Sequence, residues 1–553
     1  MRVIFPRRQV RRVLPALALL SAALTPPALA QAPAAREVAP PRLVVFITVD
    51  QLIPVYFERY GAQLTGGLAR FHRNGAFYTN AYQDHAVTET APGHASTMSG
   101  RFPRSTGIVA NDRGVQDTLA PLIGGGGPGA SPYRFRGSVL YDWMRAADPL
   151  ARSLSVSRKD RGAILPLGRA GRDVFWYAWD GRMTSSAYYR DTLPAWVQRF
   201  NARRIPQSYA GKEWTLLLPA SEYPEPDSIP LENRGRDFTF PHRIAEDPAR
   251  AAATFSSYPW MDDMVLQLAL DGVQAMRLGD SARTDLLAVS LSTTDAVGHA
   301  YGPDSREVHD QVLRLDRALG AFIDSLYKVR DSSTIAFALT ADHGVGSYPQ
   351  LYAQKKPLPV QFVDVRPVVK ATVDAVTARG APAGAFDWDY GVLYLNRPAL
   401  RRAGVDPDSL VQACGSQLRR VPGVARVDDP RTLAQRDTVN DAIARRWVHM
   451  LPPDLDVPLV ASLEPGAYWA GTTYATHGTP HDYDAHVPVA FYGPWFVPGR
   501  HAAFTRVVDM APTLARVVGV NPTEPLDGRV LTSALVPALQ GGSTADRAAT
   551  GER

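Results

Sequence analysis

The chain has 553 residues, of which 45% are hydrophobic and 21% charged, and this composition is typical of a globular protein with a large core. The formal net charge is +6, but residues 1–30 hold five arginines and no acid, so the remaining chain is close to +1 and predicts no nucleic-acid partner. Cys414 is the only cysteine, which excludes an intramolecular disulfide and leaves His, Asp, Glu and hydroxyl groups as metal ligands.

The first 30 residues have the order of regions of a secretory signal peptide. Arginines precede an apolar stretch over 13–24, and a small-residue site follows at 28–30. The apolar stretch is shorter than the roughly 20 residues that cross a bilayer. We therefore expect cleavage after about Ala30, a linker over 31–41, a periplasmic or secreted protein, and no stable membrane anchor.

Four apolar, β-prone runs along the chain predict the strands of one sheet. They occupy 43–49, 286–291, 335–339 and 487–492. Runs that are apolar on both faces are typical of central parallel strands. An amphipathic helix opening near 304 joins the second run to the third, which makes a βαβ unit. The sequence thus predicts an α/β fold with a doubly wound, mostly parallel central sheet and helices on both faces.

The remaining segments are expected to surround this core. Residues from about 115 to 260 are rich in Gly, Pro and aromatic residues, and we expect them to wrap the rim of the site. Residues 360–450 are interpreted as an inserted α/β cap. The catalytic domain would then comprise 42–359 and 451–540, and the polar residues 541–553 would form a flexible tail.

Six acidic and histidine side chains form a candidate metal site, and five of them stand at or just past the ends of predicted strands. They are Asp50, Asp295, His299, Asp342, His343 and His477. Each alone has an ordinary explanation, since an Asp after a strand often caps a helix and a lone His is usually structural. Together they match zinc ligands gathered at the carboxyl edge of a sheet, and they divide into two sets of three.

A nucleophile for such a site should be a hydroxyl near the N-terminus of a helix, where free N–H groups favour an anion. Thr90 meets this requirement, because Pro92 suits the first turn of a helix that would start just after it. On the local sequence alone, Thr90 could equally be no more than a helix N-cap.

Six segments resemble, in sequence and in order, the motifs of the alkaline phosphatase superfamily. They are 49–51, 90–94, 107–112, 295–299, 340–344 and 476–478. The chain is most similar to the threonine-nucleophile branch, which includes PafA-like periplasmic phosphatases and nucleotide pyrophosphatase/phosphodiesterases. The resemblance spans about 43–518.

The resemblance implies a role for each matching residue. Thr90 would be the nucleophile and a metal contact, and Asn111 would donate to a phosphoryl oxygen. Two Zn²⁺ ions are implied, one held by Asp295, His299 and His477, and the other, beside Thr90, by Asp50, Asp342 and His343. The implied reaction is hydrolysis of small-molecule phosphate monoesters through a phosphothreonine, as in an alkaline phosphatase.

Lys159 and Arg161 resemble the cationic pair of the PafA-like monoesterases. A monoester carries an extra charged oxygen where a diester carries a second substituent, so cationic donors there favour the monoester. A solvated charge cluster is the ordinary interpretation of such a run. We expect both side chains to bind substrate together with Asn111. The alternative is a phosphodiesterase or nucleotide pyrophosphatase on the same metal core.

Some positions depart from the family pattern or compete with it. Arg113 stands where an aromatic residue is expected, so the pattern does not assign the leaving-group side of the pocket. His481 and His486 compete with His477 as the last ligand, and His94 is interpreted as structural. A sulfatase is disfavoured because the only cysteine has no metal-site context. A binding protein without turnover is disfavoured because the ligand set is complete.

Overall fold

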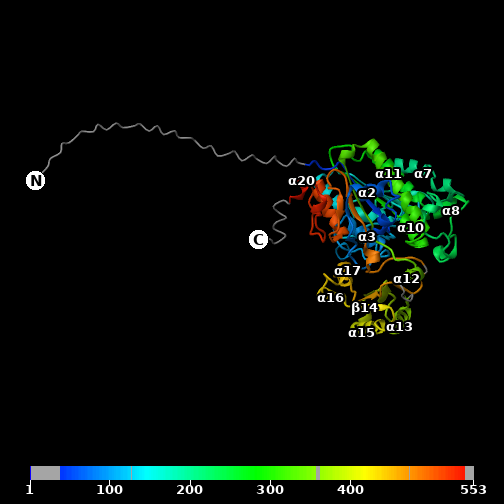
Figure 1. Cartoon of the computed structure of the whole chain (residues 1–553). Coiled ribbons are helices and arrows are strands. Elements are labelled where there is room, and N and C mark those ends of the chain that lie inside the picture. The colour runs from blue at the N-terminus through cyan, green and yellow to red at the C-terminus, as the bar shows by residue number, and fades with distance from the viewer. Residues whose placement is uncertain (2–37, 126, 356–360, 473, 542–553) are drawn as a thin grey trace, which may run out of the picture. The chain divides into compact units, whose positions relative to one another are not determined.

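A computed structural model describes residues 1, 38–125, 127–355, 361–472 and 474–541. The predicted signal peptide beyond Met1, most of the predicted linker and the tail after Gly541 therefore lie outside the described residues. Within 38–541, the chain is built on a nine-stranded sheet with the order β18-β2-β17-β10-β1-β9-β4-β5-β6. Figure 1 shows the ribbon of the chain with its main helices labelled.

The centre of this sheet is parallel, as the sequence predicted. The parallel strands are β10 (Ile335–Thr340), β1 (Leu43–Val49), β9 (Asp285–Leu291), β4 (Ser153–Ser157) and β5 (Asp173–Tyr177). Every residue of β1 is buried, because helices cover both of its faces. The mixed edges are made by β18 (Gly499–His501), β2 (Ala76–Tyr78), β17 (Val489–Tyr492) and β6 (Met183–Thr184).

The fourth predicted run, 487–492, contains β17, but this strand pairs antiparallel with β10 and with β2. The expectation that it continues the parallel set was wrong. The chain enters β17 from the edge where the parallel strands end, so it must cross the sheet in the opposite direction. Burial between two neighbours makes a central antiparallel strand as apolar as a parallel one, and the pattern could not distinguish them.

The predicted βαβ unit is present, and its two strands, β9 and β10, pair with β1 on either side. From β9 the chain passes through α10 (Thr293–Tyr301) and α11 (Arg306–Val329) to β10. Ser305 caps α11 by accepting a hydrogen bond from the Val308 amide. The apolar face of α11 is buried over Val308, Val312, Leu315, Leu319, Phe322, Ile323 and Leu326.

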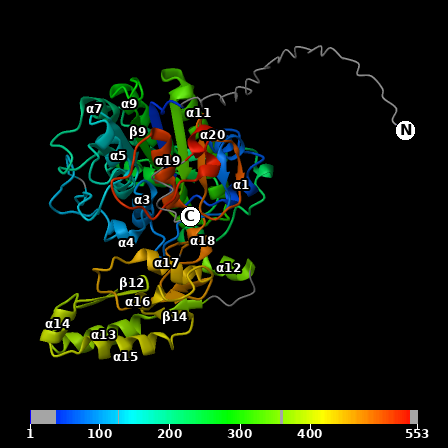
Figure 2. The same ribbon diagram turned by 90° about the vertical axis from the view of Figure 1, so that its left-hand side faces the viewer.

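Helices form layers on both sides of the sheet (Figure 2). In one layer α11 contacts α2 (Gly67–Asn74) and α9 (Trp260–Ala275), and in another α5 (Leu140–Ala147) contacts α19 (Met510–Val518). Over the part of the chain that the structure describes, no helix is long and apolar enough to span a bilayer.

Asp316 of α11 ties α2 to the core. Its buried carboxylate accepts hydrogen bonds from the amides of Thr65, Gly66 and Ala69 at 2.7, 2.6 and 3.0 Å, so it caps a helix other than its own. Asp316→Ala leaves these donors unpaired and should lower the free energy of unfolding by about 3 kcal/mol or more, measured by chemical denaturation.

Asp324 on the same helix is the matched control. Its carboxylate pairs with Arg70 at 2.7 Å but is half exposed, so Asp324→Ala should cost less than about 0.5 kcal/mol. Equal losses for the two variants would contradict the capping role of Asp316.

The segment predicted to be an inserted cap has its own four-stranded sheet with the order β12-β13-β15-β14. Its strands are β12 (Phe386–Asp389), β13 (Val392–Leu395), β14 (Val424–Asp428) and β15 (Leu459–Leu463), and its longer helices are α13 (Arg366–Thr377) and α15 (Pro407–Leu418). Because β15 pairs with both β13 and β14, the sheet extends past the predicted boundary at 450. Burial in this core raises the pKa of the Cys414 thiol to about 11, which keeps it unreactive.

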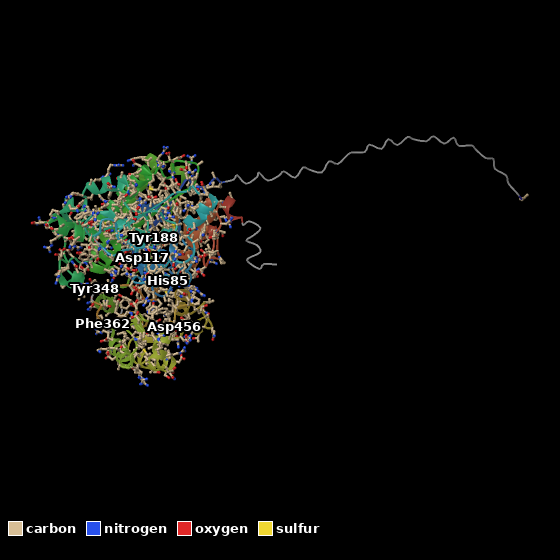
Figure 3. All side chains as sticks on the ribbon, turned by 180° about the vertical axis from the view of Figure 1, so that it is seen from behind. His85, Asp117, Tyr188, Tyr348, Phe362 and Asp456 are labelled. Carbon is tan, nitrogen blue, oxygen red and sulfur yellow. The ribbon has the colours of Figure 1, made fainter. Side chains whose placement is uncertain are left out.

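An apolar cluster joins the predicted cap to the rest of the described chain. It includes Ala86 and Val87, which lie a few residues before Thr90 in the chain, and Trp447 and Val460 from the side of the predicted cap. His85 and Asp456, each next to a member of this cluster in the sequence, are labelled in Figure 3.

Candidate metal centre

The six predicted ligands meet at the carboxyl ends of the parallel strands. Asp50 directly follows β1, and Asp295 and His299 lie on α10 just after β9. Asp342 and His343 follow β10, and His477 comes from the loop that leads back to β17. Three adjacent strands therefore deliver five of these side chains to one edge.

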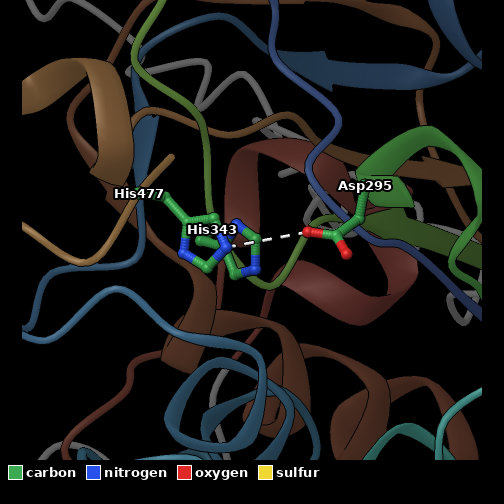
Figure 4. Close-up of side chains that lie close together, drawn as sticks. All are labelled: Asp295, His343 and His477. Atoms are coloured by element: carbon green, nitrogen blue, oxygen red, sulfur yellow. Dashed lines mark ion pairs between the residues drawn. The ribbon is translucent and has the colours of Figure 1, made fainter. Parts of the chain in front are cut away.

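The side chains form two overlapping groups that can hold a metal ion. One group contains Asp295, His343 and His477, and the other Asp50, Asp342 and His343. His299 lies beside the first group, with its Nε2 3.3 Å from Asp295 Oδ1 and 3.2 Å from His477 Nε2. The rings of His343 and His477 stack with centroids 3.5 Å apart, and Figure 4 shows them opposite the Asp295 carboxylate.

Backbone carbonyls fix the tautomer of each of these histidines. Each Nδ1 lies within hydrogen-bond distance of a carbonyl oxygen, at 2.7 Å from His299 to Ala475, 2.9 Å from His343 to Gly344, and 2.8 Å from His477 to Thr88. Because Nδ1–H donates to these oxygens, the Nε2 lone pair faces the site and can bind a metal. Burial, followed by the nearby His477, holds the pKa of His343 well below its usual value and keeps it neutral.

The carboxylates also have the character of metal ligands. Asp50 and Asp342 are fully buried, and among the described residues Asp50 Oδ1 accepts no hydrogen bond, while Asp50 Oδ2 has the Lys159 ammonium at 2.6 Å and Asp342 Oδ2 has His94 Nδ1 at 3.2 Å. Burial, Asp295 and Asp342 together raise the pKa of Asp50, because like charges crowd an apolar edge. Three buried carboxylates, those of Asp50, Asp295 and Asp342, carry more negative charge than the Lys159 ammonium balances, so the donor set fits divalent metal ions.

Lys159 brings a positive charge into this cluster. Its Nζ is 2.6 Å from Asp50 Oδ2, 2.7 Å from Asp295 Oδ2 and 3.2 Å from Thr90 Oγ1. Burial acts to raise the pKa of Asp295, but Lys159 and His299 hold it well below its usual value. Lys159 therefore contacts two carboxylates and the Thr90 hydroxyl together.

Thr90 is the first residue of α3 (Thr90–Thr97), and its side chain is buried in the cluster. Its Oγ1 lies 3.5 Å from His343 Nε2. Glu89 occupies the N-cap position, so Thr90 is not the cap that the local sequence allowed. The Thr90 hydroxyl therefore does not cap the helix, and it lies next to the candidate metal ligands at the first turn of α3.

His94 and Gln51 support this arrangement from behind. His94 Nδ1 is 3.0 Å from the Thr90 carbonyl oxygen and 3.2 Å from Asp342 Oδ2, as its structural interpretation anticipated. Sequence reasoning assigned no role to Gln51, although it donates from its backbone N to Asp342 Oδ1 (3.2 Å) and from Nε2 to Asp295 Oδ1 (3.1 Å). Its position directly after Asp50 was the only available signal.

Asn111 and Arg161 lie beside the cluster from two other segments. Asn111 Oδ1 accepts a hydrogen bond from the Ala91 amide at 2.9 Å, which fixes the side-chain amide and leaves Nδ2 available as a donor. Arg161 lies on α6 (Asp160–Ile164), and with Lys159 it lines a cavity of about 380 Å³.

Three further residues that the sequence left open have clear partners. His481 and His486 point their Nε2 atoms at the carbonyl oxygens of Leu463 and Thr79, each at 2.9 Å, and neither belongs to a metal-binding group among the described residues. Arg113 reaches the cap, where it pairs with Asp387 at 2.7 Å and lies 4.0 Å above the Tyr394 ring.

The chain is similar to known proteins over most of its length. Residues 44–385 match the family of type I phosphodiesterases / nucleotide pyrophosphatases. Alkaline phosphatase PhoV of Synechococcus elongatus is 29% identical over 90% of this chain and 94% of its own length. Alkaline phosphatase PhoK of a Sphingomonas species is 31% identical over 90% and 92%. The crystal structure of alkaline phosphatase PafA has 26% identity and a TM-score of 0.81, and covers 90% of this chain and all of that one.

Proposed function

The chain belongs to the type I phosphodiesterase / nucleotide pyrophosphatase family, and we propose that it is an exported alkaline phosphatase that hydrolyses phosphate monoesters at a two-zinc site. The observation that carries this proposal is the position of Thr90. Its hydroxyl stands at a helix start, beside His343 and Lys159, within a cluster of six candidate ligands. Two relatives that match nine-tenths of the chain, PhoV and PhoK, are named alkaline phosphatases.

The two ligand sets fit Zn²⁺ by their chemistry. Neutral imidazole Nε2 atoms and buried carboxylates are the donors that zinc prefers, and a thiolate is not required. One set is Asp295, His299 and His477, and the other is Asp50, Asp342 and His343. When bound, the ions would act as Lewis acids and lower the pKa of hydroxyl groups and water next to them.

The side chains then divide the work of phosphoryl transfer. Thr90 Oγ attacks phosphorus as the alcohol leaves, which forms a phosphothreonine, and water later attacks phosphorus to release phosphate and restore the hydroxyl. Asn111 Nδ2 donates to a phosphoryl oxygen, and Lys159 and Arg161 supply positive charge. Positioning and charge stabilisation provide most of the catalysis, as expected for a loose transition state.

Lys159 and Arg161 distinguish this proposal from a phosphodiesterase on the same core. Removing both should slow monoester hydrolysis much more than diester hydrolysis, because a diester lacks one of the charged oxygens. Charge-assisted hydrogen bonds contribute about 1.5 to 3 kcal/mol each, so Lys159→Ala with Arg161→Ala should lower monoester kcat/KM by on the order of a thousandfold. The measurement compares p-nitrophenyl phosphate with bis-p-nitrophenyl phosphate.

Arg161→Ala alone serves as the control for metal-site damage. Lys159 contacts two candidate ligands, whereas Arg161 pairs with the neighbouring Asp160 at 3.4 Å. The single variant should therefore keep its metal content and still lose monoester activity selectively. Equal losses on both esters would favour the phosphodiesterase alternative.

A further inference from the structure

A second cavity opens on the His299 side of the metal centre. Its volume is about 500 Å³, and His299 is one of its lining residues. Ala296 and Ala300, on the same face of α10 as His299, leave room for it. Tyr348, labelled in Figure 3, and Tyr474 form aromatic parts of the wall.

Two arginines, Arg234 and Arg236, line this cavity and are exposed. Among the residues that the structure describes, neither guanidinium forms an ion pair or donates a hydrogen bond, and Arg234 lies 5.8 Å above the Tyr474 ring. The neighbouring acids do not cancel this charge. Asp237 pairs with His242 at 3.2 Å, and burial, followed by Glu307 and Asp227, raises the pKa of Glu232 to about 9, so that it is neutral at pH 7.

The backbone that carries the arginines is held in an unusual conformation. Asn233, Arg234 and Asp237 have φ angles of 44°, 59° and 47°, in the left-handed region that non-glycine residues rarely adopt. Such conformations cost stability and persist where the surrounding structure fixes them, often at ligand sites. The segment thus presents two unpaired cations at the rim of the metal centre.

Attack by Thr90 sets the direction in which the alcohol leaves. Thr90 Oγ1 lies next to His343 and Lys159, and an in-line displacement places the leaving oxygen on the opposite side of phosphorus. His299 belongs to the ligand set away from Thr90, and it borders the arginine-lined cavity. We propose, on the basis of the phosphatase function above, that this cavity is the leaving-group subsite for phosphate monoesters whose alcohol carries a second anionic group, either carboxylate or phosphate.

The test uses a matched pair of substrates, 4-carboxyphenyl phosphate and 4-carbamoylphenyl phosphate, which differ in the charge of the leaving group. The R234Q/R236Q variant should lose about tenfold or more in kcat/KM on the carboxylate substrate relative to the neutral amide. R234E/R236E should enlarge this difference by charge repulsion. R401Q/R402Q, which replaces two exposed arginines of the cap, should leave the ratio unchanged.

The outcomes separate this subsite from the phosphatase proposal. If the wild-type enzyme hydrolyses both esters and R234Q/R236Q loses kcat/KM equally on the two, the subsite proposal is wrong and the phosphatase proposal stands. A wild-type enzyme with no activity on either ester would overturn both. Should the double variant not fold, as judged by circular dichroism, the single variants R234Q and R236Q make the same comparison.

Discussion

Replacement of Thr90 by alanine should abolish turnover and leave the fold intact. Among the residues that the structure describes, this hydroxyl is the only candidate nucleophile that contacts both His343 and Lys159, and loss of a covalent nucleophile lowers kcat by on the order of 10⁴ or more. Because Glu89 rather than Thr90 is the N-cap, the variant should lose only about 1 kcal/mol of stability or less. The measurements are kcat on p-nitrophenyl phosphate and the thermal midpoint.

The phosphorylated intermediate provides a second measurement of the same prediction. Phosphate trapped on the wild-type enzyme by acid should map to the peptide that contains Thr90. Thr97→Ala is the matched control, because Thr97 Oγ1 on the same helix donates to the His94 carbonyl oxygen at 2.7 Å and does not face the cluster. Phosphate found on Thr88 or Thr97 would show that the nucleophile was misassigned.

Removal of metal should be as damaging as removal of the nucleophile. Chelation should abolish hydrolysis and zinc should restore it, and Asp342→Ala or His477→Ala should reduce kcat/KM by at least about a hundredfold, since each removes one of three ligands. Chelation should also lower the thermal midpoint, because Lys159 then balances only part of the negative charge of the buried carboxylates of Asp50, Asp295 and Asp342.

Metal content gives a readout that does not depend on activity. Wild-type protein should bind two zinc ions per chain by mass spectrometry or elemental analysis, and Asp342→Ala fewer. Asp374→Ala, at a surface ion pair with Lys370, is the control and should bind as wild type does. Full activity in the chelated protein would refute the two-metal proposal.

Much of the sheet and the convergence of the candidate ligands at one of its edges could be predicted because both depend on local patterns. Runs that are apolar on both faces mark β1, β9 and β10, and polar residues at their ends must converge at one edge. The direction of β17 and the extent of the cap sheet could not be predicted, since they depend on which strands pair. The signal peptide, the tail and the assignment of individual site residues stay predictions.

Other features depend on contacts between distant segments. Arg113 and its partner Asp387 are 274 residues apart, so the sequence showed only a missing aromatic residue. The double contact of Gln51 with Asp295 and Asp342 likewise exists only once three strands are side by side. The left-handed segment that carries Arg234 has the composition of an ordinary loop.

The place of β17 in the sheet has a consequence for the order in which the protein is made. β17 lies between β2, near residue 77, and β10, near residue 337, and its own residues come at 489–492. The sheet therefore stays divided until almost the whole chain, including the cap, has been synthesised. His477, which precedes β17, also reaches the metal centre only at that stage. Contacts that span this much sequence are slow to form, so we expect catalytic competence to be acquired after synthesis rather than during it.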